Sequence, residues 1–219
     1  MQLQGQREAV VAACRELAAT GLVRGTSGNV SVRDAVSGLI AVSPSGTAYA
    51  TMEALDVAVL THDGEVLEGR LTPTTESGMH LAVYRARPDV GAVVHTHSPF
   101  ATTLAALREP VPAVHYLLAR AATTVRVAPY QRYGTPELAQ ACVRTLGDDH
   151  GVLLANHGVV AVGGDIAAAM VVAEAIEYTA EITWRARAIG VPVVLGDDEM
   201  AGVAAAFAGY GRATRRQDG

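Results

Sequence analysis

The sequence predicts one α/β domain in which helices flank a mostly antiparallel central sheet. Short apolar stretches alternate with stretches of helical periodicity, so strands and helices are expected to alternate along the chain. Asp63-Gly64 separates two of the short stretches, which is a strong signal for a hairpin and therefore for antiparallel pairing. Half of the 219 residues are hydrophobic and no linker or repeat divides the chain. We therefore expect a single domain over residues 1–219, with a mobile polar tail from about residue 210.

The individual elements follow from local patterns. The first helix, over about residues 4–20, carries Val10, Cys14 and Leu17 on one apolar face. Further helices are expected over about 75–86, 100–107, 136–146, 165–189 and 197–208. Strands are expected at about 30–32, 39–42, 57–60, 65–67, 91–97, 125–127, 152–155 and 159–162.

Charge and composition exclude several classes of protein. A net charge of −5 and a pI near 5.8 argue against nucleic-acid binding, which favours a basic face. No apolar run reaches the roughly 18 residues needed to cross a bilayer, and the first residues are too polar for a signal peptide. Cys14 and Cys142 match no metal-binding spacing and are expected to be buried, reduced thiols. We expect a soluble cytoplasmic protein that binds neither nucleic acid nor membranes.

The absence of one residue type limits the chemistry. All 17 basic residues are arginine, and the sequence contains no lysine. A Schiff base with a carbonyl substrate requires a lysine amine. Any carbonyl chemistry therefore needs another electron sink, for which a bound metal is the obvious candidate.

Two histidines are spaced so that they can share a metal ion. His95 and His97 end an apolar run, and residues two apart in a strand point to the same face. His157, at a predicted turn between two strands, is the best candidate for a third ligand. Neutral imidazoles suit zinc, and three protein nitrogens leave a position open for substrate. Alone, the spacing is only moderately specific, since His-Thr-His can merely end a strand.

The other histidines are interpreted differently. His62 belongs to the predicted hairpin turn and His150 to a surface loop. His80 follows Glu76 on a predicted helix and could reach the site, although a surface or packing role is favoured. His115 is ambiguous, beside the more interesting Tyr116.

Three polar turns lie in the first third of the chain, at residues 26–29, 43–46 and 72–75. Glycines let backbone N–H groups approach an anion, hydroxyls add donors, and the third turn opens a helix that favours a phosphate. Each turn alone is equally explained as a plain turn or helix cap. Glu76, next in the sequence, could simply complement the helix dipole.

In order along the chain, these residues resemble the class II aldolase/adducin family, most closely its L-fuculose-phosphate aldolase branch. The matching pieces cover nearly the whole chain: Gly25-Thr-Ser-Gly-Asn-Val-Ser-Val-Arg33, Val42-Ser-Pro-Ser-Gly46, Pro73-Thr-Thr-Glu76, Val93-Val-His-Thr-His97, Pro112-Ala-Val-His-Tyr116, Ala128-Pro-Tyr130, Tyr133-Gly-Thr135 and Asn156-His-Gly158. So many pieces, in the family's order and with similar spacing, make the resemblance highly specific.

The resemblance implies a role for each matching residue. The zinc ligands are expected to be His95, His97 and His157, with one Zn²⁺ per subunit. Glu76 is expected to be the acid/base carboxylate and a ligand of the resting metal. Contacts to the substrate phosphate are implied for Gly28, Asn29, Ser45, Gly46, Thr74 and Thr75. Tyr116 matches a catalytic tyrosine presented by a neighbouring subunit, and Tyr210 matches a tail tyrosine that helps close the site. The implied assembly is a homotetramer with sites between subunits.

The implied reaction is the aldol cleavage of a small ketose 1-phosphate to dihydroxyacetone phosphate and an aldehyde. Zinc would act as a Lewis acid on the ketose oxygens and stabilise the enediolate. Tyr116 would exchange a proton with the oxygen of the departing aldehyde, and Glu76 would protonate the enediolate carbon. Both L-lactaldehyde, from L-fuculose 1-phosphate, and acetaldehyde, from a 5-deoxypentulose phosphate, are compatible with the motifs.

Some departures and alternatives stay open. Thr74 and Thr75 replace the usual serines but keep the hydroxyl, whereas Tyr133 replaces a common phenylalanine and can alter the aldehyde pocket. Ribulose-phosphate 4-epimerases of the family are disfavoured, because they typically carry lysine at Ser43 and aspartate at Glu76. Methylthioribulose-phosphate dehydratases and sugar-acid phosphate decarboxylases are closer alternatives, since they can keep the glutamate. A non-catalytic, adducin-like scaffold is disfavoured because all three histidines are present.

Overall fold

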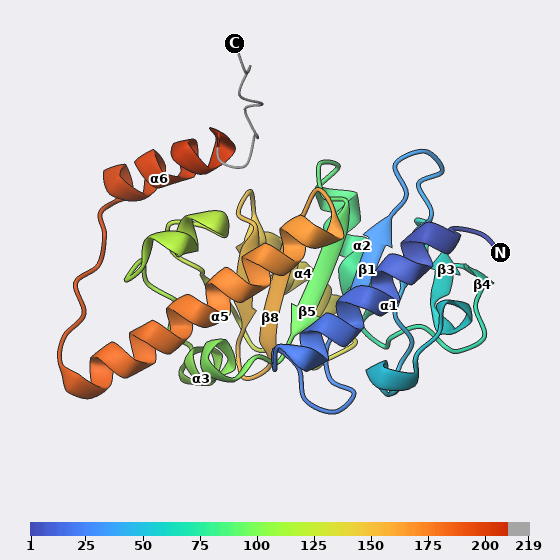
Figure 1. Cartoon of the computed structure of the whole chain (residues 1–219), viewed down its shortest axis with the longest axis horizontal. Coiled ribbons are helices and arrows are strands. Elements are labelled where there is room, and N and C mark those ends of the chain that lie inside the picture. Colours follow the sequence, from blue (N-terminus) through green and yellow to red (C-terminus); the bar gives the residue numbers. More distant parts are fainter. Residues whose placement is uncertain (210–219) are drawn as a thin grey trace, which may run out of the picture.

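The computed structural model describes residues 1–209 and has one mixed sheet covered by helices (Figure 1). Within these residues the sheet has eight strands in the order β4-β3-β2-β1-β5-β8-β7-β6. The strands are β1 (Asn29–Arg33), β2 (Ile40–Val42), β3 (Ala58–Leu60), β4 (Val66–Glu68), β5 (Ala92–Thr96), β6 (Val127–Ala128), β7 (Gly151–Leu154) and β8 (Gly158–Gly163). Every neighbouring pair is antiparallel except β6 and β7. The mostly antiparallel sheet expected from the hairpin signals is thereby confirmed.

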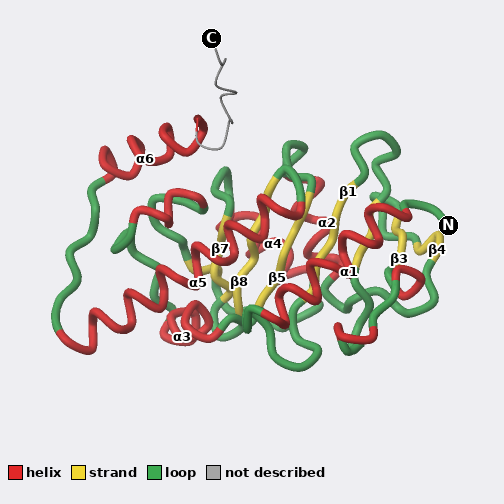
Figure 2. The backbone as a smooth tube through the Cα atoms, viewed as in Figure 1, coloured by secondary structure: helices red, strands yellow, loops and turns green. Residues whose placement is uncertain are grey.

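Helices cover both faces of this sheet (Figure 2). The α-helices are α1 (Gln4–Ala19), α2 (Ser77–Ala86), α3 (Pro99–Leu107), α4 (Pro136–Leu146), α5 (Ile166–Ile189) and α6 (Asp197–Gly209). Residues of α1, α3 and α5 form one hydrophobic core with one face of the sheet, and residues of α2 and α4 form a second core with the other face. Adjacent residues of β5 divide between the two cores, Val94 in the first and Val93 in the second, as the two-residue period of a strand requires. Cys14 and Cys142 are buried free thiols, one in each core, as expected.

Several boundaries differ from the sequence-based expectations. The helix expected from residue 75 begins at Ser77, because Glu76 is its N-cap residue with non-helical dihedral angles. The strand expected at 125–127 is only Val127–Ala128, and Val125 instead forms an isolated bridge with Val111. Short 3₁₀ helices at η1 (Tyr49–Thr51), η2 (Ala54–Asp56) and η3 (Tyr116–Arg120) were not predicted, since one turn of helix leaves no periodic pattern.

Two sequence-based expectations concern the tail and the membrane. The expected mobile tail from about residue 210 and the role of Tyr210 lie outside the described residues. Among residues 1–209, no helix combines the length and the apolar character that a membrane crossing requires.

Candidate metal centre and substrate pocket

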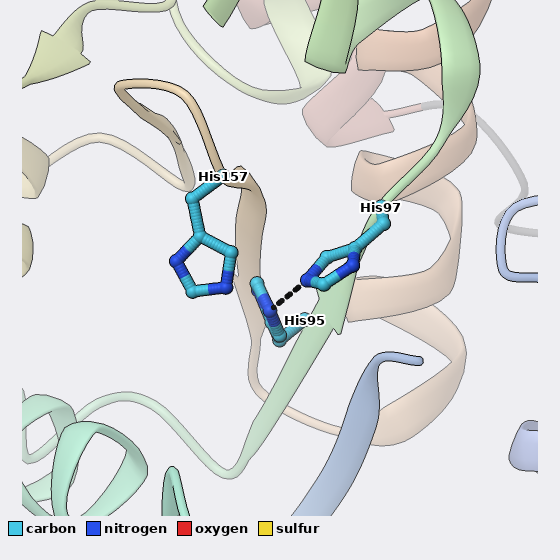
Figure 3. Close-up of side chains that lie close together, drawn as sticks. All are labelled: His95, His97 and His157. Atoms are coloured by element: carbon cyan, nitrogen blue, oxygen red, sulfur yellow. Dashed lines mark hydrogen bonds between the residues drawn. The ribbon is translucent and has the colours of Figure 1, made fainter. Parts of the chain in front are cut away.

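The three predicted histidines converge beside the centre of the sheet (Figure 3). His95 is fully buried in β5, which lies between β1 and β8, and His97 follows the last residue of the same strand. His157 comes from the tight turn that joins β7 to β8. The sheet therefore brings together residues 60 positions apart in the sequence, because β5 and β8 are paired with Thr96 opposite Val159.

The turn that carries His157 depends on two unusual backbone positions. Asn156 has a φ of 55°, a left-handed conformation that asparagine tolerates better than most residues. A Cβ atom on Gly158 would lie 2.3 Å from the carbonyl oxygen of Thr96 and 2.8 Å from Cδ2 of His97. Only glycine at this position lets the turn approach β5 closely enough for the rings to meet.

The arrangement of the imidazole nitrogens fits a bound metal ion. One ring nitrogen from each histidine lies within 4.8 Å of the others, and Nε2 of His95 is 3.0 Å from Nε2 of His97. Nδ1 of His95 is 2.8 Å from the carbonyl oxygen of Val159, to which it must donate its proton. Nε2 of His95 therefore faces the other rings, as in histidines whose second nitrogen is fixed for metal binding.

Glu76 completes the cluster. Its Oε2 atom is 3.2 Å from Nε2 of His95, and its Oε1 atom is 3.3 Å from Nε2 of His157. Oε1 is buried without a hydrogen-bond partner, although a buried carboxylate oxygen normally has one. Three imidazole nitrogens beside a carboxylate with an unpartnered oxygen are a donor set that a divalent zinc ion accepts. The residues present therefore fit the metal that the resemblance implies.

The electrostatics of the cluster favour the metal-binding protonation states. Burial acts to raise the pKa of Glu76, but the neighbouring imidazoles of His95 and His157 and the amide of Asn29 outweigh it and hold the pKa well below its usual range. Burial lowers the pKa of His97 and of His157 to about 4, with a further contribution from the neighbouring histidines. At neutral pH the carboxylate is thus ionised and these two imidazoles are neutral, which are the forms that bind a metal ion.

A pocket of about 250 Å³ opens directly onto the cluster. Glu76, His97 and His157 line it from the sheet side, and Thr75 lies beside them at the start of α2. The remaining wall comes from Tyr130, Gln131 and Tyr133 in the loop after β6, together with Asn156. Gln131 was missed by the sequence analysis because it falls between two motifs and carries no pattern of its own.

The three polar turns predicted to bind phosphate also lie next to one another. The backbone N–H of Ser43 donates to the carbonyl oxygen of Val30, and its hydroxyl accepts from the N–H of Val30. The carbonyl oxygen of Ser43 accepts from the N–H of Thr74, so the second turn touches both of the others. Pro44 and Pro73 form a bridge between the second and third turns. At Gly28, φ is 80° and a Cβ atom would lie 2.7 Å from the carbonyl oxygen of His95. The first turn is therefore held directly against the histidine cluster.

The predicted phosphate residues differ in exposure within this arrangement. Ser45, Gly46 and Thr75 are exposed, whereas Thr74 is buried and accepts a hydrogen bond from the backbone N–H of Glu76. The side chain of Asn29 is buried and donates to Glu76 rather than facing solvent. Phosphate binding by these residues stays a prediction.

Tyr116 does not lie in the pocket with Glu76 and the histidines. It is in η3, 48% exposed, and its ring packs at 4.6 Å from the ring of His115 and 6.1 Å from that of Phe207 in α6. It lines a separate pocket with Arg120, Glu174 and Tyr178. Within one chain, then, the predicted acid/base pair Glu76 and Tyr116 is not assembled.

Of the two roles favoured for His80, the surface role is wrong, whereas its buried position agrees with the packing role. His80 is only 1% exposed, and its ring joins a hydrogen-bond network that leads through Asn29 to Glu76. Its position four residues after Glu76 on one helix was a usable signal, because residues i and i+4 share a helix face. The partner residue on β1 was not predictable from that spacing.

Comparison with known proteins agrees with this geometry. Residues 8–184 match the family described as "Class II Aldolase and Adducin N-terminal domain". The chain is 46% identical over 212 residues to a 5-deoxy-D-ribulose 1-phosphate aldolase of Bacillus thuringiensis serovar kurstaki. The alignment covers 97% of this chain and 100% of the relative. It is 39% identical to a 5-methylthioribulose-1-phosphate/5-deoxyribulose-1-phosphate aldolase of Rhodospirillum rubrum, over 94% of this chain and 92% of the relative. A solved structure of an L-fuculose 1-phosphate aldolase superposes with a TM-score of 0.91 at 40% identity, over 93% of this chain and 96% of that one.

Proposed function

Because the chain belongs to the class II aldolase and adducin family, we propose that it is a zinc-dependent aldolase that cleaves a deoxyketose 1-phosphate to dihydroxyacetone phosphate and a small aldehyde. The observation that carries the proposal is the cluster of three imidazoles beside the carboxylate of Glu76, which opens to a pocket and whose Oε1 atom has no hydrogen-bond partner. A chain without lysine has no amine for a Schiff base, so a metal site is the available way to stabilise a carbanion.

In the proposed reaction, the histidine cluster, Glu76 and the polar turns have different roles. His95, His97 and His157 would hold a zinc ion, which would supply Lewis-acid polarisation of the ketose carbonyl. Glu76, ionised and at the edge of the pocket, moves a proton to and from the carbon that separates from the aldehyde. The turns at Gly28, Ser45 and Thr75 bind the phosphate through backbone N–H groups and hydroxyls.

For the substrate, we propose 5-deoxy-D-ribulose 1-phosphate, cleaved between C3 and C4 to dihydroxyacetone phosphate and acetaldehyde. The support is the 46% identity, over the full length of the relative, to an aldolase named for this sugar phosphate. L-Fuculose 1-phosphate, which would release L-lactaldehyde, is the second candidate, favoured by the close structural superposition. Tyr133, 67% exposed at the pocket where the aldehyde would leave, is the residue we expect to influence this choice.

Tyr116 reaches a site only if another chain presents it. We propose a homotetramer in which the patch around Tyr116 of one subunit faces the histidine cluster of its neighbour. The exposure of Tyr116, Tyr178 and Val171 on this patch supports the proposal, since such a surface is suited to an interface. On cleavage, Tyr116 would accept the proton of the hydroxyl group that becomes the aldehyde oxygen. In the reverse direction it would return this proton to the aldehyde oxygen as the sugar forms.

The test is a coupled assay for dihydroxyacetone phosphate across a panel of ketose 1-phosphates, with zinc-loaded and chelator-treated protein. We expect the largest kcat/KM for 5-deoxy-D-ribulose 1-phosphate and loss of turnover after chelation, restored by zinc. A folded protein with no stoichiometric metal would favour the adducin-like scaffold. Loss of water from methylthioribulose 1-phosphate, with no dihydroxyacetone phosphate formed, would identify a dehydratase instead.

A further inference from the structure

A line of buried polar side chains leads from Glu76 into the interior. Asn29 Nδ2 is 3.0 Å from Glu76 Oε2, and Asn29 Oδ1 is 2.5 Å from His80 Nε2. On the far side of the ring, His80 Nδ1 is 2.7 Å from Ser31 Oγ, which is 2.8 Å from the Tyr84 hydroxyl. All five side chains are buried, with exposures from 0% to 7%.

The line is built by one strand and one helix whose residues alternate along it. Asn29 and Ser31 are two apart on β1, so they point to the same face of the sheet. Glu76, His80 and Tyr84 are spaced by four, which puts them on one face of α2 and its N-cap. The contacts run from helix to strand and back at each step, so every member of the line is held by the packing of α2 on β1.

The chemistry of the groups fixes the direction of each hydrogen bond. An ionised carboxylate can only accept, so the amide nitrogen of Asn29 must face Glu76 and its oxygen must face His80. That oxygen can only accept, so His80 must carry a proton on Nε2. Burial lowers the pKa of His80 to about 3, so the ring is neutral and its Nδ1 atom accepts from the Ser31 hydroxyl. Ser31 then accepts from the Tyr84 hydroxyl, and every donor in the line points toward Glu76.

We propose that His80 is a positioning residue, which orients the Asn29 amide so that its N–H group holds Oε2 of Glu76 beside Nε2 of His95 and leaves Oε1 beside Nε2 of His157. The effect of His80 on catalysis rests on the proposed function, whereas the orientation of the Asn29 amide does not. Without the donor at position 80, the Asn29 amide is free to turn its oxygen toward the carboxylate, where two acceptors repel. The second N–H of the Asn29 amide stays available for a substrate oxygen.

The arrangement is tested first without any enzymatic assay. In zinc-loaded, full-length protein with ¹⁵N-labelled histidine, long-range ¹⁵N–¹H NMR reports which ring nitrogen is protonated. We expect His80 to be the neutral tautomer with its proton on Nε2, assigned by the signal that disappears in His80→Gln. A proton on Nδ1, or a doubly protonated ring at neutral pH, would overturn the proposal.

The second test compares two substitutions at the same position. Gln carries an amide N–H that can replace Nε2 of the ring as a donor to Asn29, whereas Leu cannot. In zinc-loaded enzyme we expect His80→Leu to lower kcat by about 10–100-fold, as for other outer residues that orient a metal-site group, with KM changed by less than about threefold. His80→Gln is expected to stay within about threefold of the wild-type kcat.

Thr183→Val serves as the matched control, because Thr183 is fully buried and hydrogen-bonded within α5, with no part in the line. It should destabilise the fold without lowering kcat. A wild-type kcat in His80→Leu, or an equal loss in His80→Gln, would overturn the positioning role. If the wild-type enzyme itself released no dihydroxyacetone phosphate, the proposed function would fail, while the NMR result would still decide the orientation.

Discussion

Two regions implicated in the reaction differ sharply in how far one chain completes them. The histidine cluster is assembled within the chain: His95 is fully buried, Glu76 is 7% exposed, and the ring centroids lie 4.8–5.0 Å apart. Tyr116 is half-exposed, lies on the short 3₁₀ helix η3 and lines a different pocket together with residues of α5. The predicted metal ligands are thus held by the sheet, whereas Tyr116 is exposed on a separate surface.

In the proposed mechanism, this difference separates the chemistry that depends on folding from the chemistry that depends on assembly. Three nitrogens and an oxygen directed at one point require rigid supports, and two neighbouring strands with a tight turn supply them. A group that only exchanges a proton with the substrate can come from a partner. Substitutions in the two regions can test this division.

The largest effect is expected from removing a metal ligand. His97→Ala takes away one of the three clustered nitrogens, so zinc content should fall well below one per chain. We expect kcat/KM to drop by more than the ~10–100-fold typical of residues that only orient a ligand. Metal analysis measures the zinc content and the coupled assay measures kcat/KM. His62→Ala, at an exposed position in the hairpin turn, is the control. Full activity in His97→Ala would show that the cluster is not the catalytic metal site.

Replacing the carboxylate should separate chemistry from metal binding. Glu76→Gln keeps the shape of the side chain and all three histidines but cannot transfer a proton. We expect kcat to fall by about 10²–10⁴-fold while zinc remains bound. Glu65→Gln, an exposed position in the hairpin, should leave both unchanged. A Glu76→Gln enzyme with normal kcat would remove the carboxylate from the mechanism.

The shared site is tested by mixing two inactive chains. Tyr116→Phe should lower kcat by about 10²-fold, and Tyr178→Phe on the same patch should not. When Tyr116→Phe and Glu76→Gln chains are co-expressed at an equal ratio, the mixed tetramers should regain activity. About a quarter of their interfaces pair an intact Glu76 with an intact Tyr116 of the neighbour. No recovery in the mixed tetramers would place Tyr116 in the same chain's site or outside the reaction.

The burial of the histidine region should make the metal-free fold sensitive to acid. The folded pKa is lowered to about 3 for His80 and to about 4 for His97 and His157, from an unfolded value near 6.5. The unfolded chain therefore binds more protons, and the free energy of unfolding falls as pH decreases from about 6.5 to about 4. His80 alone should contribute about 1.4 kcal/mol per pH unit, and the two partly exposed histidines less.

Urea unfolding of chelator-treated protein at several pH values measures this slope. His80→Gln should reduce the slope of the unfolding free energy against pH by the contribution of His80. Zinc should stabilise the wild type most at the upper end of this pH range, where protons compete least for the ligands. Equal slopes for wild type and His80→Gln would contradict the buried neutral state of His80.

The smallest effect is expected at the pocket wall. Tyr133→Phe removes one hydroxyl from an exposed ring, so the ratio of kcat/KM for 5-deoxy-D-ribulose 1-phosphate and L-fuculose 1-phosphate should change by no more than about tenfold. Zinc content should stay the same. A larger change would show that this hydroxyl contacts the part of the sugar in which the two substrates differ.

The sequence by itself determined the fold class, the three histidines and the order of most elements. These depend on local regularities: the two-residue spacing of His95 and His97, the Asp63-Gly64 turn and the periodicity of the helices. Motif order over nearly the whole chain identified the family, and the matched model over residues 8–184 confirmed it.

Only the tertiary structure decided which polar residues meet. His80 and Asn29 are 51 residues apart, and their contact exists because α2 packs against β1. The start of α2 at Ser77 rather than Thr75 likewise depends on Glu76 being held in the cluster as an N-cap, and helix periodicity contains no information on that. Side-chain partners across different elements are set by packing, which a linear pattern does not encode.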